Sequence, residues 1–340
     1  MAPQRSLFEY DFHIEKMDKI GDPLLKMKNS IPWDKLFKNH LDSAFGKMEK
    51  EKSNGGRPAY DSMLMFKILI LQKSYGLSDE EMEYQINDRL SFQRFLDLDL
   101  SDNVPDARTI WLYRERLENT GAAKRLFRIF QKYLNDKGLV AHKGVIVDAT
   151  FVEVPKQRNS KDENDMIKEG KKPKEWSDKK TIHKDLDARW IKKMGKSYYG
   201  YKSHIKADVK SKLIIDYVTS DASVHDSQKL RNLLGPKDKG KKLYGDSAYR
   251  SDKIEKMLKR KRIKSQIHEK GYRGNELTEI QKNSNRKKSK IRARIEHIFG
   301  HISKSMYDCI RSIGMRRAKV NIGLMNLTYN MERFMILQST

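Results

Sequence analysis

Three acidic side chains, far apart in the sequence, have the residue types and surroundings of a metal site. Asp148 stands in an apolar run between Val147 and Ala149, where an ionised carboxylate is costly to bury unless something pairs with it. Asp246 ends another short apolar segment, and ligand sites of open sheets cluster at such strand ends. Glu296 lies beside the apolar stripe of a predicted helix, in the run IRARIEHIFGHI. The three side chains could therefore point into one cleft.

Carboxylate oxygens are the ligands that Mg²⁺ prefers, and few are needed where substrate phosphates supply other oxygens. Two ions about 4 Å apart could activate an attacking oxygen and stabilise a leaving one. Each acid also has an ordinary structural interpretation. Asp148 could be a buried hydrogen-bonded residue, and Asp246 could be a turn former or helix cap. Glu296 could be the ion-pair partner of Arg292, four residues earlier. Residue types and spacing alone leave both interpretations open.

The net charge indicates the kind of partner. Lys and Arg number 71 against 46 Asp and Glu, which gives a formal charge of +25 in 340 residues. Such an excess favours a polyanion, because phosphate contacts release counterions. An anionic membrane is the weaker choice, since the most apolar stretch, residues 63–71, is short and is broken by Lys67. Nucleic acid is therefore the expected partner.

Cysteine and histidine usage narrows the class further. Cys309 is the only cysteine, so no internal disulfide can form, which fits a reducing compartment. One Cys with nine scattered His makes a structural zinc site improbable. The N-terminus is rich in acidic residues and has no apolar segment of the secretory kind. We therefore expect a cytoplasmic protein without a signal peptide.

The elements that must position the three acids follow from two periodicities. Apolar residues recur at helical spacing through residues 60–139. Gly76 would end the first helix of this stretch, and Ser78 with Glu81 forms a capping box that would begin the next. Further helices are predicted at 92–96, 105–118 and 122–136, after short helical patterns in 1–47 and a loop at 47–58. Residues 1–140 are thus predicted to be an all-helical N-terminal domain.

Beyond Lys143 the pattern changes to β-branched and apolar runs typical of strands. Strands are predicted at 144–154, 201–208, 213–220, 242–246 and 265–268. Helices are predicted at 226–234, 251–262, about 275–316 (basic) and about 319–337 (apolar). Residues 155–196 are polar without clear period, and we interpret them as an insertion that is mobile without DNA. The fold class is therefore α/β (α+β), with a mixed five-stranded sheet flanked by helices in a second domain, residues 141–340.

Motifs along nearly the whole chain carry a resemblance to a known family. The sequence resembles the bacterial insertion-sequence DDE transposases of the family numbered five. In the helical part the matching motifs are GRPAY (56–60), LMFKILILQKSYGLSDEEMEYQINDRLSFQRFL (64–96) and VPD (104–106). In the second part they are VDATFVE (147–153), DARWIKKMGKSYYGYKSHIKAD (187–208), VHDSQ (224–228), YGDSAY (244–249) and RARIEHIFG (292–300).

The resemblance implies a ribonuclease-H-like catalytic domain. The family's first Asp lies on strand one, its second just after strand four and its Glu on a later helix, which are Asp148, Asp246 and Glu296 here. It implies two Mg²⁺ ions, for which Mn²⁺ can substitute. The expected substrates are double-stranded DNA with terminal inverted repeats and a target DNA. The enzyme would cut to give 3′-OH ends and join them, acting as a homodimer on DNA in the nucleoid of a bacterium.

Related transposases carry a Tyr-Arg-Glu-Lys signature around the Glu. Arg292 matches the Arg. Ser289 stands at the Tyr position, and Ser303 stands at the Lys position with Lys304 beside it. The signature is thus matched only in part, while the three metal ligands are complete.

Several further residues are candidates for DNA contact. The densely basic run before Glu296 would lie at the mouth of the site, and its members are Arg286, Lys287, Lys288, Lys290, Arg292 and Arg294, with Lys304 beyond it. Tyr198, Tyr201 and Lys202 could stack a base and hold a phosphate, or they could be ordinary strand residues. A helix with Arg108 and Arg114 could enter a groove, or its apolar face could form a dimer interface.

The pair His225-Asp226 could orient a metal-bound water or the scissile phosphate. A plain helix cap by Asp226 is the preferred interpretation. Two rival functions also stay open: a catalytically silent DNA-binding protein derived from a transposase, and a metal-dependent nuclease that cuts without joining.

Overall fold

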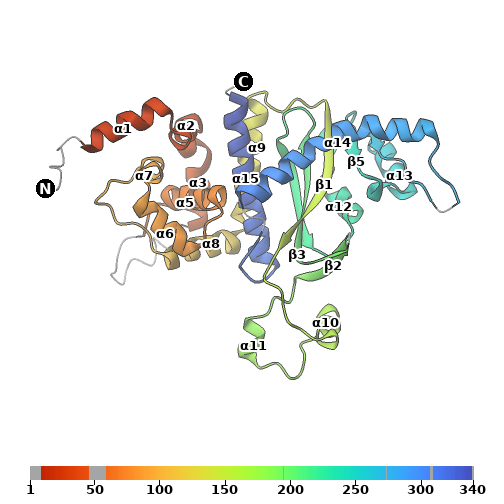
Figure 1. Cartoon of the computed structure of the whole chain (residues 1–340), viewed down its shortest axis with the longest axis horizontal. Coiled ribbons are helices and arrows are strands. Elements are labelled where there is room, and N and C mark those ends of the chain that lie inside the picture. The colour runs from red at the N-terminus through yellow and green to blue at the C-terminus, as the bar shows by residue number, and fades with distance from the viewer. Residues whose placement is uncertain (1–8, 46–58, 194, 273, 307–308, 339–340) are drawn as a thin grey trace.

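The computed structural model describes residues 9–45, 59–193, 195–272, 274–306 and 309–338. Its first part is helical, as predicted (Figure 1). The predicted loop at 47–58 lies outside the described residues. The helices of this part are α1 (Glu9–Ile20), α2 (Pro23–Ser30), α3 (Trp33–Phe45), α5 (Ser62–Tyr75), α6 (Asp79–Asp88), α7 (Leu90–Leu96), α8 (Ala107–Thr120) and α9 (Ala122–Asp136).

The helix ends follow the local sequence signals. Gly76 ends α5 in the left-handed region at φ 64°, where glycine has no Cβ to clash. Ser78 and Glu81 make both bonds of the predicted capping box at the start of α6. The side chain of Asp106 accepts from the Thr109 N–H at the start of α8. These predictions are confirmed.

The second part is built on a mixed sheet of β1 (Gly144–Glu153), β2 (Arg189–Lys193), β3 (Lys196–Asp208), β4 (Ile214–Asp221), β5 (Lys242–Gly245) and β6 (Lys264–Ile267). The main order is β4-β3-β1-β5-β6. β3 runs antiparallel to β1 and β4, whereas β5 is parallel to β1 and β6 is parallel to β5. This is the strand order of a ribonuclease-H-like sheet, so the predicted fold class is confirmed.

The sixth strand, β2, was not predicted. It pairs with the first residues of β3, while β4 pairs with the later ones. The strand β3 changes partner at Gly200, whose φ is +148° and where a Cβ would meet the Val152 carbonyl oxygen at 2.3 Å. Only glycine fits this close approach of β3 to β1.

Helices cover both faces of the sheet. On one face Val145 and Val147 pack against Leu230 of α12 (Asp226–Leu233) and Leu258 of α13 (Asp252–Arg260). Side chains alternate along a strand, so Ile146 points to the opposite face. There the long basic helix α14 (Glu279–Ser305) contacts β1 and β5. The stretch predicted as basic helices is thus one helix of 27 residues.

The last helix, α15 (Met315–Gln338), lies between the helical part and the sheet (Figure 1). It packs on α5, α8 and α9 on one side and on β4 on the other. Asn330 accepts from the Ile214 N–H and donates to its carbonyl, both at 2.8 Å. One hydrophobic core therefore runs from the N-terminal helices through α15 to the sheet. The division at residue 140 stays a prediction.

The segment 155–196, predicted as a polar insertion that is mobile without DNA, holds two short helices, α10 (Lys161–Lys168) and α11 (Asp178–Ile182), as well as β2. Ile167 and Trp176 are buried in it. Helices of eight and five residues are too short to show a helical period, which explains why the sequence did not reveal them. Within the described part of the chain, no helix combines the length and apolar character needed to cross a membrane.

Candidate active site

Asp148 and Asp246 occupy equivalent places on two neighbouring parallel strands. Gly144 of β1 is in register with Lys242 of β5, and each Asp lies four residues further along (144 + 4 = 148; 242 + 4 = 246). Asp148 therefore lies in the middle of β1, beside the carboxyl end of the shorter strand β5, which Asp246 directly follows. Asp148 also shares the face of β1 that α14 covers, because it has the same parity as Ile146. The sheet thus brings together two acids that are 98 residues apart (246 − 148 = 98).

The charges around Asp148 show how closely the acids gather. Burial raises the pKa of Asp148 to about 6, and the charges of Asp246 and Asp226 push it in the same direction. A hydrogen bond from the Ala149 N–H and the charge of Arg292 oppose the rise. Asp148 is thus a largely buried carboxylate whose pKa is raised by two like charges and lowered by the charge of Arg292.

The Asp246 side chain is held in place by the backbone two residues later in the chain. Its side chain accepts from the Ala248 N–H at 3.0 Å and caps the short 3₁₀ helix η3 (Ser247–Tyr249). Tyr249 in that turn is buried, and its hydroxyl has no hydrogen-bond partner among the residues that the structure describes. Burial and the charges of Asp148, Asp226 and Asp246 raise the pKa of this hydroxyl. The cap interpretation of Asp246 and its place beside Asp148 are therefore compatible.

Glu296 reaches this cluster through an arginine. The Arg292 guanidinium donates from Nη1 to Asp148 Oδ2 at 3.1 Å and from Nη2 to Glu296 Oε1 at 2.9 Å. The Glu296 side chain is 61% exposed, while that of Asp148 is 16% exposed. The ion pair with Arg292, expected from the four-residue spacing, is therefore present, and it extends to Asp148.

The donor set suits a hard divalent cation. Asp148, Asp246 and Glu296 offer only carboxylate oxygens, the ligands of Mg²⁺ and Mn²⁺, and burial, reinforced by the like charges of Asp246 and Asp226, raises the pKa of Asp148. A bound cation would relieve that repulsion. In the described ranges, no group of three or more His, Cys, Asp and Glu side chains is arranged to hold a metal as it stands. The acids fit the ions chemically, but Arg292 now lies between two of them.

A fourth carboxylate lies close by. Lys202 Nζ donates to Asp226 Oδ1 at 2.9 Å and to the Val224 carbonyl at 2.7 Å. The prediction that Asp226 caps its helix is wrong by one residue. His225 is the cap, because its extended backbone lets its ring accept from the Ser227 N–H, whereas Asp226 begins α12. Asp226 instead adds charge to the surroundings of Asp148.

Models of known protein families match both parts of the chain. A family model described as a transposase DDE domain matches residues 141–331, more than half of the chain. The chain belongs to the DDE transposase family. A second model, described as a transposase domain, matches residues 12–116. The membership implied by the sequence motifs is confirmed, while the family number five stays a prediction.

Among solved structures, this transposase-family chain is similar to one from a cryo-EM structure of a piggyBac transposase synaptic complex with hairpin DNA. The identity is 13%, and the match covers 95% of this chain and 76% of that chain, with a TM-score of 0.48. A likeness this distant carries no conclusion about function.

Two candidate DNA contacts of this DDE family member are buried. Tyr201 is 0% exposed, and its hydroxyl donates to the Asp185 carboxylate at 2.8 Å. Lys202 is 4% exposed and is bound to Asp226. The prediction that Tyr201 stacks a base and Lys202 holds a phosphate is therefore wrong for this conformation. Tyr198 stacks on Phe151, with ring centroids 4.5 Å apart, so the strand interpretation fits all three.

The basic run on α14 divides into two groups. Arg286, Lys287 and Lys290 are exposed, and so is Lys304 near the end of the helix. Lys288 and Arg294 instead donate to backbone carbonyls, those of Ile267 at 2.9 Å and Val209 at 2.8 Å respectively. Arg108 on α8 is exposed, whereas Arg114 makes two bonds of 2.6 Å to Asp79. Of these candidates, Lys287, Lys290, Lys304 and Arg108 are exposed, and Arg286 is exposed with one bond of 3.3 Å to Asn283 Oδ1, so these five are the better placed to meet a phosphate.

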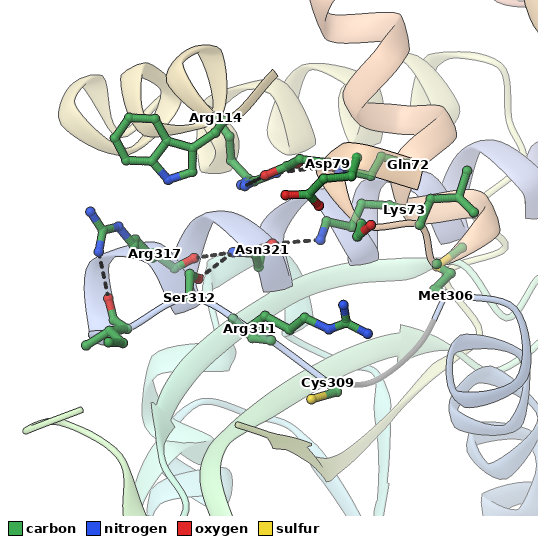
Figure 2. Close-up of a pocket in the computed structure, with 17 residues that line it drawn as sticks. Gln72, Lys73, Asp79, Arg114, Met306, Cys309, Arg311, Ser312, Arg317 and Asn321 are labelled. Carbon is green, nitrogen blue, oxygen red and sulfur yellow. Dashed lines mark hydrogen bonds and ion pairs between the residues drawn. The ribbon is translucent and has the colours of Figure 1, made fainter. Parts of the chain in front are cut away.

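A cavity of about 510 Å³ lies elsewhere, between α5, α6, α8 and the segment that leads into α15 (Figure 2). It shares no lining residue with the carboxylate cluster. Arg114 pairs with Asp79 across it, and Arg317 pairs with the nearby Glu115. It is therefore separate from the site that the family motifs indicate.

Three features of the site were missed by sequence reasoning. The Lys202–Asp226 pair and the link from Arg292 to Asp148 join elements far apart in the chain. His204 is fully buried with its ring against Ser220 Oγ at 2.8 Å, and burial lowers its pKa to about 4. The alternation along β3 could have indicated that Lys202 and His204 point inward, but it could not identify the residues that they contact.

Proposed function

We propose that this protein is an active DDE transposase that cuts DNA at the terminal inverted repeats of its own insertion sequence and joins the 3′-OH ends to target DNA. The observation that carries the proposal is that Asp148, within β1, lies beside the end of the parallel strand β5, which Asp246 follows. Glu296 is tied to the same cluster through Arg292. Membership of the family supports the reaction type.

In this proposal Asp148, Asp246 and Glu296 would hold two Mg²⁺ or Mn²⁺ ions. The ions would supply activation of the attacking oxygen and stabilisation of the leaving one in phosphoryl transfer. Asp148, with a pKa of about 6, is mainly ionised at neutral pH. The Ala248 N–H holds the Asp246 carboxylate, and Lys202 holds Asp226, whose charge acts on Asp148.

The DNA is proposed to be double-stranded and held by the exposed cations, in a protein with a net charge of +25. Residues 1–140 would bind DNA or dimerise, and residues 141–340, with the insertion at 155–196, would carry the chemistry. We further propose that the protein acts as a homodimer on DNA in the nucleoid of a bacterial cell.

The test is an in vitro assay with duplexes that carry the inverted repeats flanking the gene. Wild type with Mg²⁺ should cut and then join 3′ ends, while Asp148→Asn, Asp246→Asn and Glu296→Gln should do neither. Asp252→Asn and Glu279→Gln, at exposed positions, are matched controls that should keep both steps. Retained cleavage in all three site variants would overturn the assignment of the acids.

The same assay separates the rival functions. A protein that binds the ends but neither cuts nor joins them with Mg²⁺ or Mn²⁺ is a silent DNA-binding relative. A protein that cuts but does not join is a nuclease.

A further inference from the structure

Arg292 fills the space between two of the proposed metal ligands. Its Nη1 bonds Asp148 Oδ2 at 3.1 Å, and its Nη2 bonds Glu296 Oε1 at 2.9 Å. The other oxygen of Asp148, Oδ1, already accepts from the Ala149 N–H at 2.9 Å. Both oxygens of Asp148 are thus engaged, and the guanidinium holds the one that does not bond the backbone.

A metal ion and the guanidinium would compete for that oxygen. Mg²⁺ binds carboxylate oxygens at about 2.1 Å and demands a near-octahedral set of ligands. A planar guanidinium bonded to the same oxygen occupies that position with a like charge. Moving Arg292 away would therefore free that oxygen and remove a positive charge that opposes binding of an ion by Asp148 and Glu296.

The bonds of Arg292 are suited to such a move. Its Nε is buried without a hydrogen-bond partner in the described part of the chain, so the guanidinium is not fully satisfied where it lies. Its partner Glu296 is 61% exposed, and pairs with an exposed partner at four-residue spacing are weak. Leaving the cluster therefore breaks one weak pair and one partly buried bond, the one to Asp148.

A phosphate is the partner best able to receive the side chain. Guanidinium groups bind phosphate oxygens through two parallel hydrogen bonds. Arg292 lies on α14, the helix that also exposes Arg286, Lys287 and Lys290. A DNA backbone along this helix would bring phosphate near Arg292.

We propose that Arg292 is an internal counter-ion of the metal site, and that a DNA phosphate draws it away from Asp148 and Glu296 so that DNA binding and metal binding strengthen each other. This inference rests on the proposed function. The coupling is reciprocal, because a ligand that favours the displaced Arg292 must favour the other ligand that needs the same state. Metal ions would then load mainly on the DNA-bound protein.

The first experiment titrates the full-length protein with Mn²⁺ alone in a calorimeter. Arg292→Gln should bind Mn²⁺ about tenfold more tightly than wild type, within the usual range of coupling between sites. Arg292→Lys should also bind more tightly, because a single ammonium cannot bond the two carboxylates in the same way. Arg294→Gln removes one charge from the same helix and should stay within about twofold of wild type, since that residue bonds the Val209 carbonyl.

The second experiment repeats the titration with a terminal-repeat duplex whose 3′ end is a dideoxynucleotide, so that the end cannot be joined. Wild type should gain about tenfold in Mn²⁺ affinity, and Arg292→Gln should gain little. Equal Mn²⁺ affinities of Arg292→Gln and Arg294→Gln without DNA, or an equal gain with DNA in wild type and Arg292→Gln, would overturn the inference.

Failure of the proposed function has a different signature. If Asp148→Asn leaves the Mn²⁺ binding of wild type unchanged, the ion does not bind at the carboxylate cluster, and the metal site itself is wrong. If Asp148→Asn abolishes binding while the Arg292 variants match wild type, only the counter-ion role fails. Thermal unfolding of each variant checks that the fold is intact.

Discussion

Two Asp–Arg pairs of this protein look alike and are electrostatically opposite. At the cavity between the helices, Arg114 makes two bonds of 2.6 Å to Asp79 (Figure 2). At the sheet, Arg292 of α14 makes one bond of 3.1 Å to Asp148 of β1. The two carboxylates are about equally buried, with 18% and 16% of their side chains exposed.

Their pKa values move in opposite directions. Burial raises the pKa of Asp79, but hydrogen bonds from Arg114 and Gln72 more than offset it, so the net shift is downward. Burial raises the pKa of Asp148 to about 6, and there Asp246 and Asp226 reinforce it. One arginine satisfies one carboxylate, but it does not balance a cluster of them. The Arg114–Asp79 pair therefore stabilises the fold. The negative charge around Asp148 is not fully balanced by Arg292, so it favours a further cation.

The largest expected effect separates the pairs by activity. Asp246→Asn should lower the rate of end cleavage by about 1,000-fold or more, because losing a metal ligand removes several kcal/mol of transition-state stabilisation. Asp79→Asn should leave the rate per folded molecule within a few-fold of wild type. Single-turnover cleavage at a temperature where both variants are folded measures this. Equal losses of cleavage rate in Asp246→Asn and Asp79→Asn would contradict the proposed difference between the two sites.

The next effect separates the pairs by stability. Arg114→Ala leaves the Asp79 carboxylate buried and unpaired, which should cost about 3 kcal/mol of unfolding free energy. Arg292→Ala should cost less, about 1 kcal/mol, because Arg292 makes one bond to Asp148 rather than two and its other partner, Glu296, is 61% exposed. Urea unfolding followed by circular dichroism gives both values. A larger loss of unfolding free energy for Arg292→Ala than for Arg114→Ala would show that Arg292 mainly stabilises the fold.

The pH dependence sharpens the same contrast. The pKa of Asp148 is about 6 in the folded protein against 3.8 ordinarily, so its charge destabilises the fold increasingly as pH rises from about 4 to about 6. The unfolding free energy of Asp148→Asn should therefore gain on that of wild type across this window and keep a constant lead above it. For Asp79, whose pKa is lowered, the stabilisation is present above its ordinary pKa and is lost as pH falls below it. Asp79→Asn should thus be less stable than wild type at neutral pH, and this deficit should close in acid.

The smallest effect concerns the exposed cations of α14. Lys287→Gln and Lys290→Gln should each lower the slope of log K against log salt for duplex DNA by about 0.9, the value for one phosphate contact. Lys288→Gln is the matched control, because Lys288 bonds the Ile267 carbonyl and Glu269, and its slope should not change. Fluorescence anisotropy across a salt series measures all three. An equal change for Lys288→Gln would mean that exposure does not decide which lysines meet DNA.

Much of the fold could be predicted because its signals are local. The caps at Ser78 and Asp106, the glycine stop at Gly76 and the strand that carries Asp148 each depend on a few neighbouring residues. The pairing of Arg292 with Glu296 was also within reach, since four residues on a helix are neighbours. Such features need no knowledge of tertiary structure.

The rest depends on contacts that cross the fold. The burial of Tyr201 against Asp185, the Lys202–Asp226 pair and the reach of Arg292 to Asp148 join separate elements. Sequence spacing cannot show that a lysine in a strand faces an acid 24 residues later (226 − 202 = 24). The acids of the site were therefore predictable as residues, while the arginine between them was not.

A crystal structure of the wild-type protein grown with Mn²⁺ and the dideoxy-terminated repeat duplex tests the metal site most directly. We predict an anomalous scattering peak of Mn²⁺ within coordination distance of both Asp148 and Asp246. The Arg292 guanidinium should have moved from Asp148 to a DNA phosphate. Saturating Mn²⁺ with no peak at these two carboxylates, and with Arg292 still bonded to Asp148 and Glu296, would contradict it.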